Sequence, residues 1–362
     1  MTKYNVYLRK DGRWEGRISR GKKNGKRKYQ YIFAKTKEEV IRRIDDIVCE
    51  TAYQECRMSF RVLYSEWYVN VKYRIKESTL ANYVMKVNKH ILPYFGNYSI
   101  NLLNSERIVA FIDSKIGEGL SSRYISDIVI LLKTILKYAV KHYHIKNPMD
   151  NIELPKKRKP EITILDESEQ MKLQDYISNN HNYSTLGTAL SMTTGIRIGE
   201  LCALQWKDID LEKRILTVRK TMQRIQCPTN LSKTKLIITD PKSQSSRRKI
   251  PIPDCIVSFL AEFKAESNSY VLTGTKKPIE PRTMQYRFRT ILNNAKLPSI
   301  HFHALRHIFA SSCIALGFDV KALSELLGHS SVEITLNIYV HSSFDQKRAY
   351  MNRIKLSLLA KD

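Results

Sequence analysis

The spacing of apolar residues changes along this 362-residue chain, and these changes constrain its fold more than any other feature. Between residues 4 and 34, three short runs alternate apolar and polar residues, as half-buried strands do. From residue 58 to about 150, apolar residues recur every three or four positions, as on one face of a helix. A mixed pattern follows. We therefore predict a multidomain protein whose parts differ in fold class.

Residues 1–57 predict a small α+β domain. Turn-forming sequences separate the runs 4–8, 13–19 and 28–34, and Thr36 and Glu39 form a capping box before a helix. We expect a three-stranded antiparallel sheet with that helix packed on one face. Strand alternation directs one set of residues toward the helix: Val6, Leu8, Trp14, Ile18, Tyr29, Tyr31 and Phe33. It directs the other set outward: Tyr7, Arg9, Arg17, Lys28 and Gln30.

The same segment concentrates positive charge. Residues 1–37 contain 13 Lys and Arg but 2 acidic residues. A β-ribbon fits the major groove of DNA, so the outward residues Tyr7, Arg9, Arg17, Lys28 and Gln30 are candidate DNA contacts. The alternative is an ordinary, solvated basic surface.

Residues 58–150 predict an all-α bundle of four amphipathic helices, and nothing in the segment has a catalytic pattern. The helices are expected at about 59–74, 78–93, 104–117 and 121–144. Residues 151–164 then form a linker that includes the basic run Lys156 to Lys159. One interpretation is a plain solvated tether. The other is a basic, extended connection between two domains that wrap around a DNA duplex.

The chain as a whole is strongly basic, with 61 Lys and Arg against 35 Asp and Glu. This excess favours a polyanionic partner, although charge alone does not separate DNA, RNA and an anionic membrane surface.

Asp127, Lys133 and Lys137 interrupt the most apolar stretch, so no run is expected to span a bilayer. The N-terminus lacks the apolar core of a signal peptide, and the six cysteines are scattered. We expect a cytoplasmic protein with reduced thiols.

Residues 165–362 predict a mixed, mainly α-helical domain with a small antiparallel sheet formed by residues 214–220 and 247–252. In the sequence TGIRIGEL, Arg197 follows a tight turn at Gly195 and begins a helix. Arginine is a planar, permanently charged donor that suits a phosphate, and Glu200 lies one turn further along to orient it. A purely stabilising pair of Arg197 and Glu200 is the alternative.

Two further motifs lie downstream. In HALRH, His303 and Arg306 share one face of a helix, so a second arginine can approach the same phosphate. The neighbouring histidines also suggest a metal site, but no Cys or carboxylate completes a ligand set, and we expect none. In LLGHSS, Gly328 and His329 precede Tyr339 by about ten residues. A lone Tyr is more often a core residue than a nucleophile.

The order Arg197, His303-x-x-Arg306, Gly328-His329 and Tyr339 resembles the tyrosine recombinase (phage integrase) family. The catalytic resemblance covers residues 165–345. The helical segment resembles the core-binding domain of that family. The basic sheet resembles the arm-binding domain of integrases from phages and conjugative transposons. Ala304 departs from the family, which often has Asp there.

The resemblance implies a catalytic set made of Arg197, Lys242, His303, Arg306, His329 and the nucleophile Tyr339, with Glu200 in support. The family's lysine lies on a β-hairpin, where Lys242 fits best and Lys233, Lys235 and Lys249 remain alternatives. The implied reaction joins DNA to Tyr339 through a 3′-phosphotyrosyl link, with His303 as base and Lys242 as general acid. It needs no metal, cofactor or ATP, and it integrates and excises a mobile element.

The implied partners are double-stranded DNA with core and arm sites, three further copies of the chain in a tetramer on DNA, and an accessory directionality protein. The free protein is expected to be a monomer. A C-terminal tail helix is expected to carry an apolar stripe made of Tyr350, Ile354, Leu358 and Leu359. This stripe docks either on its own domain or on a neighbouring copy of the chain.

Two alternative functions are a type IB topoisomerase and a catalytically inactive DNA-binding regulator. The basic N-terminal domain argues against the first, and the complete motif set argues against the second.

Overall fold

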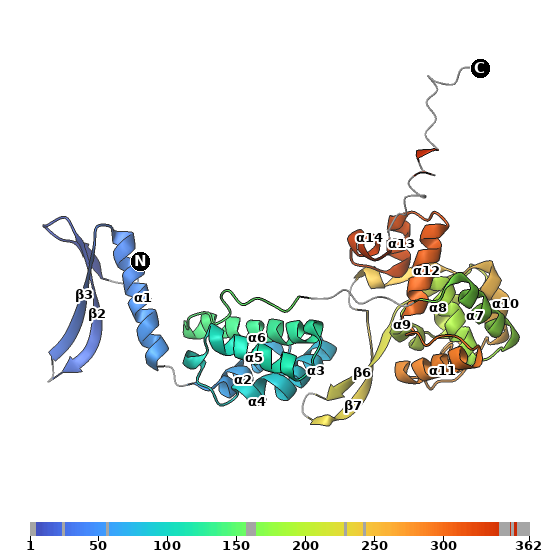
Figure 1. Cartoon of the computed structure of the whole chain (residues 1–362), viewed down its shortest axis with the longest axis horizontal. Helices are drawn as coiled ribbons and strands as arrows, with labels where there is room; N and C mark the ends of the chain where they lie inside the picture. Colours follow the sequence, from blue (N-terminus) through green and yellow to red (C-terminus); the bar gives the residue numbers. More distant parts are fainter. Residues whose placement is uncertain are drawn as a thin grey trace, which may run out of the picture. The chain divides into compact units, whose positions relative to one another are not determined.

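The computed structural model describes residues 5–23, 26–55, 58–156, 164–227, 230–241, 244–339, 348 and 351–352. The chain divides into two compact units, one mainly of residues 1–159 and the other mainly of residues 160–362. Each unit is described by itself. The elements of both are labelled in Figure 1.

The first unit begins with the predicted α+β fold. Strands β1 (Val6–Leu8), β2 (Trp14–Lys23) and β3 (Lys26–Ala34) form an antiparallel sheet in that order, and helix α1 (Lys37–Glu55) packs on it (Figure 1). The Thr36 hydroxyl accepts a hydrogen bond from the Glu39 backbone N–H at 3.2 Å, as the predicted cap requires. Ile32, Ala34, Val40 and Ile44 form its buried core.

The face of β3 that packs on α1 is the opposite of the predicted one. Ile32 is buried, whereas Tyr31 and Phe33 are 52% and 37% exposed. Ile32 lies opposite Gly16 in the sheet, and a Cβ at Gly16 would lie 2.5 Å from Ile44 Cδ1 on the helix. Helix α1 therefore crosses the sheet at Gly16 and covers Ile32. The prediction is wrong because apolar residues occupy both alternating sets of β3.

The register corrects other assignments. Gln30 pairs with Ile18 and shares the helix-facing side, so it is not an outward residue. Leu8 is 57% exposed at the end of β1 and does not join the core. The side chain of Lys28 lies outside the described residues. The outer face, as the structure describes it, carries Tyr7, Arg9, Arg17, Tyr29, Tyr31 and Phe33.

The rest of the first unit is the predicted helical bundle. Its elements are α2 (Phe60–Val71), α3 (Glu77–Lys86), a π-helical turn (Val87–Ile91), α4 (Leu92–Phe95), a 3₁₀ turn (Ile100–Leu102), α5 (Ser105–Gly117) and α6 (Ser122–Tyr143). Side chains of Ser59, Asn104 and Ser121 cap α2, α5 and α6. The helix expected at about 121–144 is α6, and its apolar face is buried from Ile125 to Ala139. The second predicted helix is the continuous path from α3 through the π turn to α4.

The second unit is mainly helical, as predicted. Its helices are α7 (Glu167–Asn179), α8 (Tyr183–Thr194), α9 (Ile198–Cys202), α10 (Asp254–Glu262), α11 (Pro281–Asn294), α12 (Ala304–Ala315), α13 (Val320–Leu327) and α14 (Val332–Tyr339). Short 3₁₀ turns cover Trp206–Asp208 and Gln244–Ser246. One large core of buried residues extends from Leu165 to Ile308.

Two small antiparallel sheets accompany these helices. Strands β4 (Ile209–Asp210), β5 (Ile215–Val218) and β8 (Arg248–Pro251) form the predicted sheet. The long stretch between β5 and β8 contains a second sheet, the hairpin of β6 (Thr221–Cys227) and β7 (Asn230–Thr239). Arg224 on β6 pairs with Glu280 at the start of α11, at 2.5 and 2.8 Å. Among the described helices, none has the length and apolar character needed to cross a bilayer.

The separate cores predict separate responses to core mutations. Phe111 is fully buried among residues of the helical bundle, so Phe111→Ala should destabilise that bundle by roughly 3 kcal/mol. Differential scanning calorimetry should show a lower melting temperature for one transition only. The matched control is Phe288→Ala, whose ring is buried in the core of the second unit, and it should lower the other transition. A single transition lowered by both variants would contradict the separation.

Candidate active site

The turn between α8 and α9 brings Arg197 to the site. Gly195 ends α8 with φ +62°, the left-handed conformation that glycine favours. A Cβ at Gly195 would lie 2.5 Å from a Phe309 ring carbon and 2.9 Å from Leu327 Cδ2. The turn therefore packs directly against α12 and α13. Arg197 follows as the residue that begins α9, as the sequence predicts.

Glu200 holds two arginines by hydrogen bonds. Its Oε1 accepts from Arg197 Nη1 at 2.9 Å, and its Oε2 accepts from Arg248 Nη2 at 2.9 Å. The side chains of Glu200 and Arg248 are 3% and 5% exposed. Burial raises the pKa of Glu200, but the charges of Arg248 and then Arg197 oppose it, and the net pKa is lowered. Glu200 is thus a buried carboxylate that balances positive charge.

Arg306 enters from α12 and is almost completely buried, at 2% exposed. Its Nη1 donates to the carbonyl of Gly195 at 2.7 Å, and its Nη2 donates to the carbonyl of Leu327 at 2.6 Å. The first bond joins Arg306 to the turn that precedes Arg197. The two arginines that the sequence selected therefore meet at the same turn.

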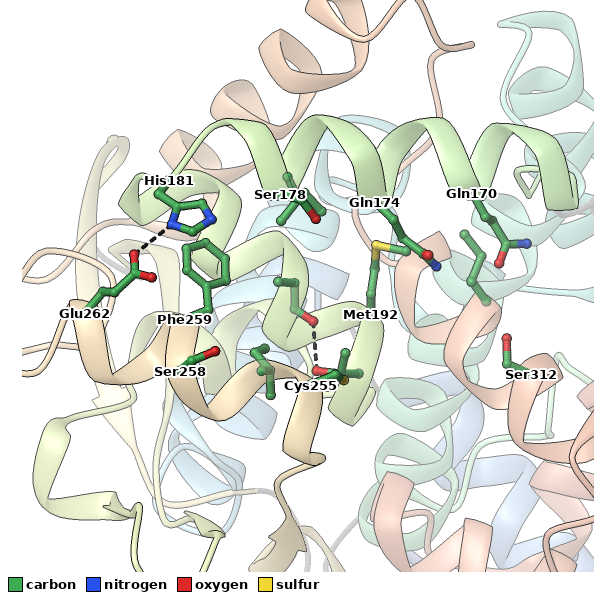
Figure 2. A pocket seen from close by; sticks show the side chains of 15 residues that line it. Gln170, Gln174, Ser178, His181, Met192, Cys255, Ser258, Phe259, Glu262 and Ser312 are labelled. Atoms are coloured by element: carbon green, nitrogen blue, oxygen red, sulfur yellow. Dashed lines mark hydrogen bonds and ion pairs between the residues drawn. The ribbon is translucent and has the colours of Figure 1, made fainter.

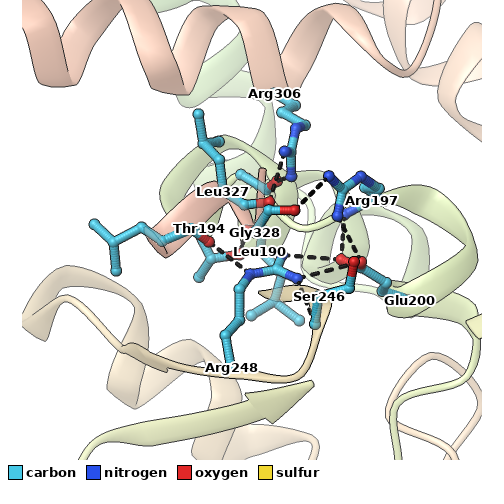
Figure 3. A network of polar contacts seen from close by, with 11 residues as sticks. Leu190, Thr194, Arg197, Glu200, Ser246, Arg248, Arg306, Leu327 and Gly328 are labelled. Atoms are coloured by element: carbon cyan, nitrogen blue, oxygen red, sulfur yellow. Dashed lines mark hydrogen bonds and ion pairs between the residues drawn. The ribbon is translucent and has the colours of Figure 1, made fainter. Parts of the chain in front are cut away.

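The C-terminal end of α13 contacts three arginines through three successive carbonyls (Figure 3). The carbonyl of Leu326 accepts from Arg248 Nε at 2.6 Å, that of Leu327 from Arg306, and that of Gly328 from Arg197 Nη2 at 3.0 Å. A helix C-terminus carries partial negative charge, so it stabilises cations there. We call Arg197, Glu200, Arg248 and Arg306 the arginine network.

Gly328 is essential to this arrangement because its φ is +64°. A Cβ on Gly328 would lie 3.0 Å from Arg248 Nη1 and 3.0 Å from the carbonyl oxygen of Ser245. Both the backbone conformation and the space therefore favour glycine. The close approach also places the segment before β8 against the turn that leads into His329.

The two predicted histidines lie beside the network and are neutral at neutral pH. Burial lowers the pKa of His303 to about 4, with further contributions from His307, Arg306 and Arg197. Burial also lowers the pKa of His329 to about 4, followed by the charges of Arg306, Arg197 and Arg248. His303 keeps part of its surface exposed although neighbouring protein atoms desolvate its ring, and His329 is half-buried. The structure therefore brings Arg197, Glu200, His303, Arg306 and His329 together.

Other predicted site residues are placed only in part. Tyr339 is the last residue of α14, but its side chain lies outside the described residues. Lys242 and the side chain of Lys233 also lie outside them, as does most of the C-terminal tail. Lys235 and Lys249 are described, and both are exposed. Across the described parts of the chain, no group of three or more His, Cys, Asp or Glu is placed to hold a metal ion.

Arg248 is the site residue that the sequence analysis missed. It lies in a run of three basic residues, Arg247, Arg248 and Lys249, which composition cannot tell apart. Strand alternation supplies the signal, because Arg248 shares a face of β8 with the buried Ile250. An arginine on the buried side of a strand must find a carboxylate or carbonyl partner, and Glu200 is that partner.

A cavity of about 430 Å³ lies elsewhere in the second unit, between α7, α8, α10 and α12 (Figure 2). At one end of it, His181 Nδ1 is 2.7 Å from Glu262 Oε2, and the His181 ring packs on Phe259. None of the predicted catalytic residues lines this cavity. The cavity is therefore separate from the arginine network.

Comparison with known proteins gives matches over both the helical bundle and the second unit. The profile of the phage integrase family matches residues 163–346, and that of the phage integrase N-terminal SAM-like domain matches residues 59–116. A tyrosine recombinase XerC-like protein of Caldanaerobacter subterraneus is 31% identical over 294 residues, covering 73% of this chain and 75% of that protein. The ICEBs1 integrase of Bacillus subtilis is 26% identical over 307 residues, covering 81% of each.

Solved structures share the fold. The integrase of transposon Tn1549, in complex with a circular intermediate DNA, has a TM-score of 0.68 at 24% identity, covering 82% of this chain and 99% of that one. A lambda integrase dimer bound to a core site has a TM-score of 0.62 at 20% identity, covering 79% and 100%. The family profile spans the whole arginine network, and the chain therefore belongs to the phage integrase family and is a tyrosine site-specific recombinase.

Proposed function

We propose that this recombinase integrates and excises a mobile DNA element, with Tyr339 as its nucleophile and the arginine network as its phosphate site. The observation that carries the proposal is the convergence of Arg197 and Arg306 on the Gly195 turn and the end of α13, beside two neutral histidines. Guanidinium groups are the side chains best suited to hold the oxygens of a phosphodiester.

The reaction follows from these groups. Tyr339 Oη attacks the phosphorus in line, His303 accepts the phenol proton, and the bond from phosphorus to the 5′-oxygen breaks. Arg197 and Arg306 stabilise the charge that develops on the non-bridging oxygens. Lys242 donates a proton to the departing 5′-oxygen. A second DNA strand then attacks the 3′-phosphotyrosyl link with its 5′-hydroxyl and releases Tyr339. No ATP is consumed, because the link conserves the energy of the ester bond.

The low pKa of His303 fits this role in the presence of DNA. In the free protein, His303 is neutral and able to accept a proton. Arg306 and Arg197 are among the groups that lower its pKa, and a bound phosphate offsets their charge. The same phosphate therefore raises the basicity of His303 when Tyr339 must lose its proton.

The positions of Ser245 and Lys249, which are both described, favour Lys242 over Lys249 as the general acid. Ser245, three residues after Lys242, approaches Gly328 so closely that a Cβ there would lie 3.0 Å from the Ser245 carbonyl. Lys249 is exposed and alternates along β8 with Arg248 and Ile250, so it lies on the opposite face of the strand from the network. Lys233 and Lys235 remain alternatives on β7.

The outer face of the N-terminal sheet is proposed to bind a second, arm-type DNA site. The Arg9 guanidinium carbon lies 5.3 Å from the centroid of the Phe33 ring, and that of Arg17 lies 5.3 Å from the Tyr29 ring. Arg9 and Tyr7 also contact Glu15, which fixes their positions. Basic groups held on aromatic rings form a rigid surface for a DNA groove. Gln30 is removed because it faces the helix, and the side chain of Lys28 lies outside the described residues.

We further propose that the protein is a monomer when free, acts in the bacterial cytoplasm and assembles as a tetramer on DNA. Lambda integrase, which shares the fold with a TM-score of 0.60 at 18% identity, has been solved as a tetramer on a Holliday junction. The tail residues Tyr350, Ile354, Leu358 and Leu359 would dock on a neighbouring copy of the chain, and an accessory directionality protein would bias the reaction toward excision.

None of the relatives named above is a topoisomerase or a regulator, so neither alternative function is favoured.

Tyr339→Phe should abolish the covalent protein–DNA adduct and leave DNA binding unchanged, because only the nucleophilic oxygen is removed. The adduct is measured as a labelled DNA band that stays attached to the protein in a denaturing gel. The matched control is Tyr350→Phe, which should form the adduct at the wild-type level. An adduct that persists in Tyr339→Phe and disappears in Tyr350→Phe would transfer the nucleophile to Tyr350.

Lys242→Ala should slow cleavage of an ordinary substrate by about 100-fold or more, because the 5′-oxygen loses its proton donor. A substrate with sulfur at the 5′-bridging position should restore the rate, since a thiolate leaves without a proton. Single-turnover cleavage of both substrates measures the effect. Lys249→Ala is the control and should cleave both substrates normally. Equal defects of Lys242→Ala on both substrates would exclude Lys242 as the acid.

Arg17→Ala should weaken arm-site binding by about tenfold and reduce its dependence on salt, while core-site binding is unchanged. Footprinting on the DNA that flanks the gene measures both sites in one experiment. Arg42→Ala removes the same charge from the exposed side of α1 and should protect both sites normally. If Arg17→Ala and Arg42→Ala weakened the two sites alike, net charge rather than the outer face would explain binding.

A further inference from the structure

Helix α14 contributes the buried polar side chain of Thr335 to the site. Thr335 is completely buried, and its Oγ1 lies 2.8 Å from Nδ1 of His329. Thr335 lies one helical turn before Tyr339, on the same short helix. The contact therefore joins the helix of the proposed nucleophile to a histidine of the proposed phosphate site.

The direction of this hydrogen bond follows from the partners within reach. Within the described residues, the hydroxyl of Thr335 has one acceptor for its hydrogen, which is Nδ1 of His329. A hydroxyl that donates to Nδ1 requires that Nδ1 carry no hydrogen. Because the pKa of His329 is lowered to about 4, the ring is neutral at neutral pH and has one N–H. That hydrogen must then be on Nε2.

We propose that Thr335 is a positioning residue that fixes His329 as the Nε2–H tautomer, so that Nε2 donates a hydrogen bond to the scissile phosphate. An imidazole with the hydrogen on Nδ1 would instead present a lone pair at Nε2 and repel the phosphate oxygens. A partner that holds the other nitrogen of a functional histidine commonly sets its tautomer and ring orientation. Thr335 acts through His329 and does not touch DNA itself.

The first test needs no DNA and is therefore independent of the proposed function. In protein labelled with ¹⁵N-histidine, NMR distinguishes a protonated ring nitrogen from an unprotonated one, and the spectrum of His329→Gln identifies the signals of His329. In the wild type, Nδ1 should give the unprotonated signal and Nε2 the protonated one. Thr335→Val keeps the shape of the side chain but removes the hydroxyl, and it should shift His329 toward the other tautomer. Thr335→Ser should retain the wild-type pattern.

The second test measures whether the hydroxyl acts through His329. Thr335→Val should slow single-turnover cleavage by about 10- to 100-fold, with unchanged DNA affinity, and Thr335→Ser should recover most of the rate. In the His329→Gln background, adding Thr335→Val should cause no further loss, because the two residues form one unit. This arm rests on the proposed catalytic role of His329.

A matched control removes a similar buried hydroxyl elsewhere. Thr188 is fully buried in α8 and donates to the carbonyl of Ser184 at 2.9 Å, so Thr188→Val should leave the His329 tautomer and the cleavage rate unchanged. If Thr335→Val does not fold, Thr335→Ala replaces it in both tests. An unchanged tautomer without the hydroxyl would overturn the proposal, and so would a loss of rate that persists in His329→Gln. Failure of Tyr339 to form the adduct would instead overturn the proposed function and leave the tautomer result intact.

Discussion

Three positively charged guanidinium groups lie within one site of this protein, and the rest of the site depends on how their mutual repulsion is overcome. The end of α13 provides one carbonyl to each of Arg248, Arg306 and Arg197, and Glu200 provides a carboxylate to two of them. Burying one carboxylate and two of the three arginines is costly, and only complete hydrogen bonding makes it tolerable. The arginines are therefore held in place by protein groups alone.

The same hydrogen bonds account for the tight turns at Gly195 and Gly328 on either side of the site. Gly195 and Gly328 both adopt left-handed conformations, and each brings backbone carbonyls to within hydrogen-bond distance of an arginine. Arg197 is the N-cap of the five-residue helix α9 and lies two residues after Gly195, whose carbonyl accepts from Arg306. His329 follows Gly328 immediately and is held by Thr335. The carbonyl contacts of the arginines, the contact between His329 and Thr335, and the start of α14 thus depend on one continuous segment.

Much of this site could be predicted from the sequence. The order of Arg197, His303, Arg306 and His329 along the chain, together with its resemblance to the tyrosine recombinase family, selected these residues. Their convergence depends on long-range contacts, such as that between Arg306 and Gly195, which lie 111 residues apart. Arg248 could not be distinguished from Arg247 and Lys249 by composition, because only the register of β8 decides which side chain is buried. The prediction of which face of β3 is buried was wrong for a similar reason. A long-range contact between Gly16 and α1 determines that Ile32, and not the aromatic residues of β3, packs against the helix. The predicted helices required no such contact, because their own periodicity defined the buried face.

The neutral histidines have a consequence for the charge balance of the reaction. The arginine network combines three positive charges with the negative charge of Glu200, which leaves two positive charges in excess. A phosphodiester brings one negative charge, and an attacking phenolate brings a second. In the proposed reaction, the proton that leaves Tyr339 moves to His303, so the excess charge of the network faces the charges of the phosphodiester and the phenolate together. If His303 were already protonated in the free protein, it would add positive charge to the site and could not accept that proton.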